Sequence, residues 1–463
     1  VDQRFPAGGL VGKLRAQMPR QVGGHHGTTH APRLKGALLL VDGANNAALV
    51  VIQHGAVDGA GNMVQRVFGG RPRINEGVKR VAVCHAHGAA VAHGLPRAAP
   101  QAAGTMARTM TVDSKPIRLT QFSHGGGCGC KIAPGLLQEI LARAPQGIVP
   151  PELLVGTETS DDAAVYRLND SQALVATTDF FTPIVDDPYD FGRIAATNAL
   201  SDIYAMGGTP IMALALVGMP IAQLPPEVIG RVLEGGAAVC REAGIPIAGG
   251  HSIDVLEPIY GLVGLGLVHP QRVRRNADAQ AGDVLVLGKP LGVGILSAAL
   301  KKGILDAAGY ADMLRYTTQL NRVGIALGAL EGVHAMTDVT GFGLAGHLLE
   351  VCRGSGLSAR VNLAQVPFIE AAAKFALDGV VTGASARNWA AYGADVAWAP
   401  GAPEWQRHLL TDPQTSGGLL VSCSPEALHH VLDTFQHAGF AAAAAIGGMQ
   451  VRAQGQGSQL VCG

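Results

Sequence analysis

The sequence predicts an α/β or α+β layered fold, with mixed sheets flanked by helices and at least two domains. Short apolar runs typical of buried strands alternate with longer helical patterns from about residue 117 onward. Gly207 and Gly208 follow the helix predicted at 191–206, at a position where glycine favours helix termination. The charge balance also changes sign. Residues 1–105 contain 12 Lys and Arg and 4 Asp and Glu, whereas the rest of the chain contains 23 Lys and Arg and 31 Asp and Glu. Such an asymmetry marks a boundary between unlike parts.

The composition is typical of a soluble globular protein. The chain has 463 residues, of which 48% are hydrophobic and 15% are charged, so it can bury more than one sizeable core. No uncharged apolar run approaches the roughly 18 residues that span a bilayer, and no secretion signal opens the chain. The seven cysteines are an odd number and are scattered along the sequence. We therefore expect a cytoplasmic protein whose thiols stay reduced.

Residues 1–110 are predicted to be an atypical extension without a stable fold, or the product of a translation start placed too early, with the true start at Met106 or Met110. The segment is rich in Gly, Ala, Pro, His and Arg, and its apolar runs at 37–41 and 47–52 lack helical periodicity. Two functional interpretations are weaker, because no motif is complete. One is a basic arm that binds nucleic acid. The other is a metal site that would use Cys84, His85, His87 and His93.

Residues 111–275 are predicted to form the first domain. Pro134 suits the first position of a helix whose apolar stripe is Leu136, Leu137, Ile140 and Leu141. A second helix at 191–206 is closed by Gly207 and Gly208, and a third covers 228–243. The predicted strands are 174–178, which ends at Asp179, then 211–217, then 245–248 leading into a loop at 249–252, and finally 259–268.

Residues 276–463 are predicted to form a second domain that begins near Gln280. Its predicted strands are 284–287, 333–337, 419–423 and 443–446, and its predicted helices cover 292–301, a segment through Val351, and a segment from Pro425. The strand at 333–337 runs into a glycine-rich turn at 338–346. Alternation of this kind again favours a layered fold.

The most informative stretch is residues 123–131, Ser-His-Gly-Gly-Gly-Cys-Gly-Cys-Lys. Four glycines leave its backbone pliable, and it carries Cys128, Cys130 and Lys131. A thiolate is the nucleophilic form of cysteine and a nearby cation favours it, so Cys128 suits a soft nucleophile while Lys131 holds a terminal phosphate. A surface loop with incidental cysteines and a zinc site are the weaker interpretations. No second Cys or His pair completes a zinc site nearby.

Five carboxylates recur where predicted strands or helices meet loops. Mg²⁺ prefers oxygen ligands and usually binds through one or two carboxylates together with substrate phosphates. Asn198 and Asp202 lie four residues apart on one predicted helix and so share a face. A single aspartate is more often a helix cap or a turn residue, and only the set favours a metal–polyphosphate site. The five are Asp161, Asp162, Asp179, Asp202 and Asp338.

Two further glycine-rich turns could bind anions. Gly341-x-Gly343-x-x-Gly346 matches a dinucleotide fingerprint, but no acidic residue for the ribose follows about 20 positions later. We interpret it as a helix N-terminus that can face an anion. The turn at 249–252 could act in the same way. Residues 124–131 are not a Walker A loop, because Cys130 precedes the lysine and Ile132 follows it.

Together these stretches resemble the selenophosphate synthetase family, also called selenide, water dikinase. The resemblance runs in unbroken order from about residue 117 to the C-terminus, and residues 1–105 lie outside it. The similar stretches are 119–131, 158–165, 177–181, 195–202, 248–254, 336–343 and 412–418.

The resemblance implies a two-domain fold like that of aminoimidazole ribonucleotide synthetase, with 111–275 as the ATP- and magnesium-binding catalytic domain. It also implies a homodimer that converts ATP, selenide and water into selenophosphate, AMP and phosphate. Cys128 and Lys131 match the catalytic positions, and Asp162, Asp202 and Asp338 match magnesium ligands. Positions that match ATP contacts are Thr159, Ser160, Asp161, Asp179, Asp202, Gly250, His251 and Ser252, together with Lys131.

Two alternatives belong to other classes of function. One is a different ATP-dependent enzyme of the same fold superfamily, such as a small-molecule kinase or an amidine-forming synthetase. The other is a nucleic-acid binder with an inactive ATP site. Nucleic acid is the less favoured partner, because the acidic body after residue 105 would repel a polyanion.

Overall fold

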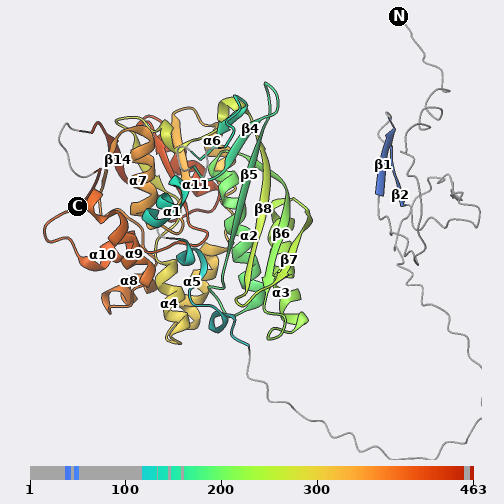
Figure 1. Ribbon diagram of the computed structural model, residues 1–463. Coiled ribbons are helices and arrows are strands. Elements are labelled where there is room, and N and C mark those ends of the chain that lie inside the picture. The colour runs from blue at the N-terminus through green and yellow to red at the C-terminus, as the bar shows by residue number, and fades with distance from the viewer. Residues whose placement is uncertain are drawn as a thin grey trace, which may run out of the picture. The chain divides into compact units, whose positions relative to one another are not determined.

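The computed structural model describes residues 37–42, 46–51, 117–132, 134–143, 147–157, 161–452 and 459–463. The chain divides into two compact units, Val1–Ala107 and Arg108–Gly463. In the first unit, β1 (Ala37–Asp42) and β2 (Asn46–Val51) form an antiparallel hairpin, drawn in blue in Figure 1. These strands coincide with the two short apolar runs of the sequence. The candidate metal ligands from Cys84 to His93 lie outside the described residues.

A six-stranded sheet organises the first half of the second unit. Its strand order is β3-β4-β5-β8-β6-β7, and its pairs are antiparallel except for β6 and β7. Two long helices, α2 (Pro188–Ala205) and α3 (Pro226–Ala243), pack together, and α2 lies against β5 and β8 (Figure 1). The strands are β3 (Leu153–Val155), β4 (Ala164–Arg167), β5 (Ala173–Phe181), β6 (Thr209–Met219), β7 (Ile247–Asp254) and β8 (Ile259–Val268).

The local sequence explains the bounds of α2. The side chain of Asp187 accepts a hydrogen bond from the backbone N–H of Asp190, and Pro188 occupies the first turn. Nearly every residue from Phe191 onward is buried, because the helix lies between the six-stranded sheet and neighbouring elements. The left-handed Gly207 (φ 73°) ends it. This burial forces polar side chains of α2 to find partners within the protein.

A seven-stranded mixed sheet organises the second half, in the order β10-β13-β9-β14-β11-β15-β12. β15 pairs in parallel with β11 and β12, and the other pairs are antiparallel. The strands are β9 (Val284–Leu287), β10 (Val333–Asp338), β11 (Ser358–Val361), β12 (Val396–Trp398), β13 (Leu419–Cys423), β14 (Ala444–Gln450) and β15 (Leu460–Cys462).

Helices flank this second sheet. They are α4 (Val293–Lys301), α5 (Ala307–Thr317), α6 (Val323–Ala329), α7 (Gly343–Ser355), α8 (Glu370–Leu377), α9 (Gly383–Tyr392), α10 (Glu404–Leu410) and α11 (Leu428–His437). Before the first sheet lie two short 3₁₀ turns, η1 (Leu119–Phe122) and η2 (Gly127–Cys130), and α1 (Pro134–Ala142). The structure therefore confirms the predicted layering of mixed sheets and helices.

One hydrophobic core joins the first sheet to helices of the second half. Phe191 of α2 packs with Phe181 and Tyr260, at ring-centroid distances of 6.1 and 6.4 Å. The same buried cluster includes Ile295 of α4 and Met313 of α5. The two halves of the second unit therefore meet through buried apolar side chains. Among the helices that the structure describes, we find no candidate membrane span.

Two sequence expectations were wrong in detail. The strand expected to end at Asp179 continues to Phe181, because Asp179 and Phe180 pair with Leu262 and Gly261 of β8. The expected loop at 249–252 lies inside β7, where its residues pair in parallel with β6. In both places a neighbouring strand extends the ladder beyond the apolar run, which a single segment of sequence does not reveal.

Candidate active site

The glycine-rich segment, residues 123–131, is held against both halves of the second unit. The N–H of Gly127 donates to the carbonyl of Thr182 at 2.8 Å, and that of Cys128 donates to Thr415 Oγ1 at 3.1 Å. Gly127 has a φ of 53°, and a Cβ there would lie 2.2 Å from Ile184 Cγ2. Only glycine fits this position without strain. The segment is therefore anchored at its centre, and this anchor places the two cysteines.

Cys128 is buried, with 1% of its surface exposed. Its Sγ donates to Asn198 Oδ1 at 3.4 Å, and the same oxygen accepts the backbone N–H of Ser416 at 2.7 Å. Burial raises the pKa of the Cys128 thiol to about 12, and the opposing effect of the Lys131 charge is smaller. In this arrangement the thiol is protonated at neutral pH. The nearby lysine does favour the thiolate, as expected, but burial outweighs its effect.

Lys131 faces Asp179, which lies on β5. Its Nζ lies 3.9 Å from Asp179 Oδ1, and the lysine side chain is 38% exposed, so the ammonium group reaches the adjoining cavity. The carboxylate of Asp179 raises the pKa of Lys131, and this effect exceeds the opposing effect of burial. Asn198 Nδ2 also donates to Asp179. Lys131 therefore stays charged, and Asp179 joins it to the asparagine that holds the Cys128 thiol.

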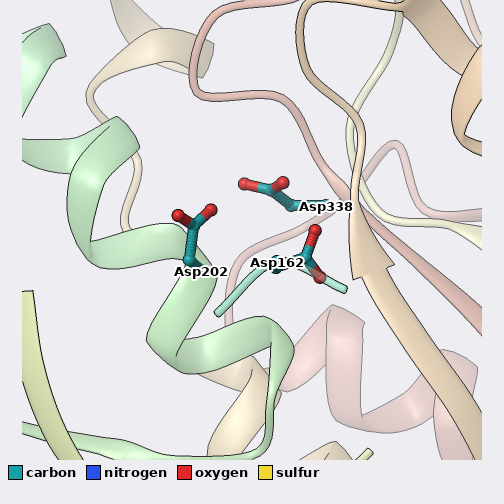
Figure 2. A group of neighbouring side chains, drawn as sticks. All are labelled: Asp162, Asp202 and Asp338. Atoms are coloured by element: carbon teal, nitrogen blue, oxygen red, sulfur yellow. The ribbon is translucent and has the colours of Figure 1, made fainter. Parts of the chain in front are cut away.

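Three aspartates meet beside this segment. Oxygen atoms of Asp162, Asp202 and Asp338 all lie within 4.8 Å of one another. They come from the turn before β4, from α2 and from the end of β10, and Figure 2 shows their carboxylates directed toward a shared space. Thr337 Oγ1 donates to Asp162 at 2.8 Å, and Thr177 Oγ1 donates to Asp202. The fold thus collects three carboxylates that lie far apart in the sequence.

The carboxylate cluster fits a divalent cation. Burial, and then the charge of neighbouring carboxylates, raises the pKa of Asp162 and Asp202 well above the ordinary value, and burial raises that of Asp338. Asp162 Oδ2 and Asp338 Oδ2 are buried and accept no hydrogen bond from the described residues. Buried carboxylate oxygens without partners cost free energy, and a hard cation is the partner that oxygen ligands of this kind suit.

A large cavity opens over the cluster. Its volume is about 950 Å³, which leaves room for a nucleotide and its phosphates. Lys131 and Asp179 line one part of it, and the three aspartates of the cluster line another. Asp161 also lines it, and its carboxylate accepts the backbone N–H of Asn276 at 2.6 Å. The cavity thus brings Lys131 together with every aspartate of the sequence prediction.

Other predicted site residues are not brought together here. Gly250, His251 and Ser252 lie on the exposed edge strand β7 and do not line this cavity. Thr159 and Ser160 lie outside the described residues.

Several residues at the site were missed as functional candidates. Asn198 was noted only for its spacing from Asp202, although it links Cys128, Asp179 and Ser416. The segment 412–418 supplies Thr415 and Ser416, and it carried a signal only as part of the family resemblance. Ser416 is the one non-glycine residue with positive φ (51°) among those the structure describes. Such a backbone is held by its surroundings and is common at functional sites.

Gly341 shows why the glycine fingerprint before α7 is not a dinucleotide site. A Cβ at Gly341 would lie 2.7 Å from the carbonyl oxygen of Cys128 and 2.9 Å from Lys131 Cδ. The turn therefore packs directly against the segment that carries the thiols. Its glycine permits that close approach.

Two family descriptions match the second unit. Residues 160–268 match the AIR synthase related protein N-terminal domain, and residues 280–457 match the corresponding C-terminal domain.

Curated relatives match most of this chain at high sequence identity. Selenide, water dikinase of Burkholderia pseudomallei (strain K96243) is 68% identical over 344 residues, which is 74% of this chain and 97% of that protein. This chain belongs to the selenide, water dikinase family. The dikinase of Pseudomonas straminea is 65% identical over 346 residues, covering 74% and 96% of the two chains. That of Rhizobium meliloti (strain 1021) is 57% identical over 330 residues, covering 71% and 95%.

Solved structures support the fold of this dikinase. The protein tt0281 from Thermus thermophilus matches with a TM-score of 0.55 at 19% identity, over 72% of this chain and 98% of that one. Hydrogenase maturation protein HypE matches with a TM-score of 0.52 at 21% identity, over 68% and 90%. At these identities the likeness shows the two-domain AIR synthase-like fold. The chain is thus an enzyme of the dikinase family built on that fold.

Proposed function

We propose that this enzyme converts ATP, selenide and water into selenophosphate, AMP and phosphate at the cavity between Lys131 and the cluster of Asp162, Asp202 and Asp338. The observation that carries the proposal is the convergence of the thiol-bearing segment with that cluster on one cavity. The names of the relatives favour this reaction over the alternative, a small-molecule kinase or amidine-forming synthetase of the same fold. We also propose the domain division at residues 275 and 276, which the matched ranges support.

The three clustered aspartates would hold Mg²⁺ through their carboxylate oxygens. Bound there, the cation would neutralise charge on the phosphate oxygens and on the aspartates. The mutual repulsion of the carboxylates and the two unpartnered oxygens support this assignment. Asp161 and Asp179 line the same cavity, and we assign them, with Thr159 and Ser160, to the nucleotide.

Lys131 would contact the terminal phosphate. Its ammonium group is the cation of the glycine-rich segment, and it faces the cavity that holds the aspartates. Phosphoryl transfer depends mainly on positioning and on neutralising charge, and an anionic selenide approaching an anionic phosphate needs that neutralisation. Lys131 therefore orients the phosphate and lowers the repulsion between the two reactants.

Cys128 would meet the selenium next to that phosphate. Its thiol is shielded from water and held by Asn198, and its carbonyl accepts the backbone N–H of Lys131 at 3.1 Å, which keeps the two residues together. A site without bulk water protects ATP from hydrolysis before selenide is bound. The thiol at this position offers a soft hydrogen-bonding group to a soft nucleophile.

We propose a homodimer in which β7 is covered by a partner subunit. β7 forms the edge of the six-stranded sheet and is almost wholly exposed, and an unpaired edge favours association with another strand. Gly250, His251 and Ser252 lie on it, so a partner at this edge would contact them. The six free cysteines of the described residues support a reducing, cytoplasmic location.

Phosphorus NMR of anaerobic reactions with ATP, Mg²⁺ and selenide tests the proposal. We expect a selenophosphate signal together with AMP and phosphate, and no AMP without selenide. Cys128→Ser and Lys131→Ala should each abolish the selenophosphate signal while the melting temperature changes little. ATP turnover that does not depend on selenide would instead identify a different kinase of this fold.

A further inference from the structure

A second cavity is lined by other residues of the glycine-rich segment. Its volume is about 270 Å³. Gly125, Gly126 and Gly129 form one wall, and α4 and the start of α9 form the others. Lys131 and the clustered aspartates line only the first cavity. The segment therefore contributes to two cavities, one with the carboxylates and one without them.

Two cations line this second cavity. Lys301 Nζ donates to the carbonyl of Ser123 at 2.9 Å, and an Arg387 guanidinium nitrogen donates to the carbonyl of Gly129 at 2.9 Å. An ammonium group has three donors and a guanidinium five, so each keeps donors for a ligand. Within the part of the chain that the structure describes, neither forms an ion pair with a carboxylate. Both residues are exposed and line the cavity, so their charge is available to a ligand there.

The acidic groups near this cavity already have partners. Glu257 pairs with the His124 ring at 2.8 Å, and Asp186 pairs with Arg118 at 2.8 Å. Asp412 is buried beneath α4, where it accepts the backbone N–H of Ile295 at 3.1 Å. Among the residues that the structure describes, Lys301 and Arg387 line the cavity and no Asp or Glu does, so its wall suits a small anion.

The cavity is also close to both thiols. Thr415 lines it, and its Oγ1 accepts the backbone N–H of Cys128 at 3.1 Å. A Cβ on Gly125, which lines it too, would lie 2.5 Å from Cys130 Sγ. The cavity lining therefore contacts Cys130 Sγ through Gly125 and the backbone of Cys128 through Thr415.

We propose that this cavity binds the anionic selenium donor, hydrogen selenide, through Lys301 and Arg387 before it reaches the phosphate. The assignment rests on the proposed selenophosphate synthesis and names where its second substrate binds. Hydrogen selenide is a small monoanion at neutral pH. The polyanionic nucleotide would repel it from the first cavity, whereas two cations attract it to the second.

The test compares Lys301→Gln, Arg387→Gln and the double variant with the wild-type enzyme. Glutamine keeps a donor for the Ser123 or Gly129 carbonyl and removes the charge. We expect the KM for selenide to rise about three- to tenfold for each single variant, and by about the product in the double variant. The KM for ATP should stay unchanged, and Arg387→Lys should restore most of the affinity. Lys302→Gln, the neighbouring exposed lysine outside the cavity, is the matched control.

A binding measurement makes the outcome independent of turnover. Anaerobic equilibrium dialysis with radiolabelled selenide and no ATP should show binding to the wild-type and Cys128→Ser proteins, and loss of binding in the double variant. An unchanged KM and unchanged dialysis in the double variant would overturn the proposal. Equal changes in the KM for ATP and in the KM for selenide would also overturn it. They would indicate that Lys301 and Arg387 only support the structure of the glycine-rich segment. Absence of selenophosphate from a wild-type protein that still binds selenide would refute the reaction and leave the binding site standing.

Discussion

The Cys128 thiol donates a hydrogen bond to Asn198 Oδ1 at 3.4 Å, so a side chain of the glycine-rich segment is held by one in the middle of α2. The same asparagine accepts the Ser416 N–H and donates to Asp179. One amide therefore connects the thiol, the carboxylate that faces Lys131, and the left-handed turn at 416. This arrangement fixes the sulfur relative to the cavity that contains the aspartates.

Replacing Asn198 should release the thiol. Asn198→Ala leaves the Ser416 N–H and the Cys128 thiol without their acceptor, at a cost of about 1–3 kcal/mol of unfolding free energy. We expect selenide-dependent AMP formation to fall more than tenfold and alkylation of Cys128, followed by peptide mass spectrometry, to speed up. Asn388→Ala is the control, because Asn388 is a buried amide that bonds the carbonyls of Gly341 and Thr411 and not the thiol. Equal alkylation rates in both variants would contradict the role given to Asn198.

Removing one carboxylate of the cluster should stabilise the metal-free protein and weaken its binding of Mg²⁺. The pKa of Asp338 is raised in the folded protein, so the unfolded chain ionises first, and stability is lost as pH rises through the folded pKa. Asp338→Asn should therefore raise the melting temperature of the metal-free protein at pH 8 by roughly 1–3 °C. It should also weaken the further stabilisation that added Mg²⁺ gives the wild type. Calorimetry with and without Mg²⁺ checks both parts, and an unchanged Mg²⁺ titration removes Asp338 from the ligand set.

The buried Lys289 should make stability depend on pH in alkaline solution. Its Nζ donates to the carbonyls of Gln319 at 2.7 Å and Ser416 at 2.8 Å, and burial lowers its pKa to about 7. Between about pH 7 and 10 the unfolded chain holds this proton and the folded one does not, so the group adds stability as pH rises, by up to about 1 kcal/mol per pH unit. Denaturant unfolding should show this slope in the wild type. The slope should be smaller in Lys289→Met, and parallel curves would contradict the assignment.

The conformation of Gly127 should be essential to the segment. In Gly127→Ala the new methyl group would meet Ile184 Cγ2 at 2.2 Å, at a φ of 53°, so the segment must shift. We expect a loss of about 1–3 kcal/mol of unfolding free energy and of selenophosphate formation. At Gly129 a Cβ would lie 3.4 Å from Pro413 Cγ, an ordinary contact. Gly129→Ala therefore serves as the stability control, and equal melting temperatures for the two variants would show that the backbone at 127 is not constrained.

The sequence by itself determined the layered fold, the glycine-rich thiol segment and the set of aspartates. Those features depend on local patterns: apolar periodicity, glycine at turns, and short motifs that stay in order along the chain. The strands at 259–268 and 284–287 were predicted with their observed bounds, and the helix predicted at 228–243 ends where expected but begins two residues earlier, at Pro226. Elements such as α8, α9 and β15 were missed, because long-range contacts stabilise them: α8 packs on α4 and α10, α9 contacts α7, and β15 pairs with β11 and β12.

Only the tertiary structure decided which of those residues work together. Asp162, Asp202 and Asp338 are distant in sequence, and they meet because α2 and β10 pack side by side. The same packing buries Cys128 and raises the pKa of its thiol, which outweighs the opposite effect of the adjacent lysine. Desolvation depends on every neighbour that excludes water, and those neighbours are set by long-range contacts that no local stretch of sequence specifies.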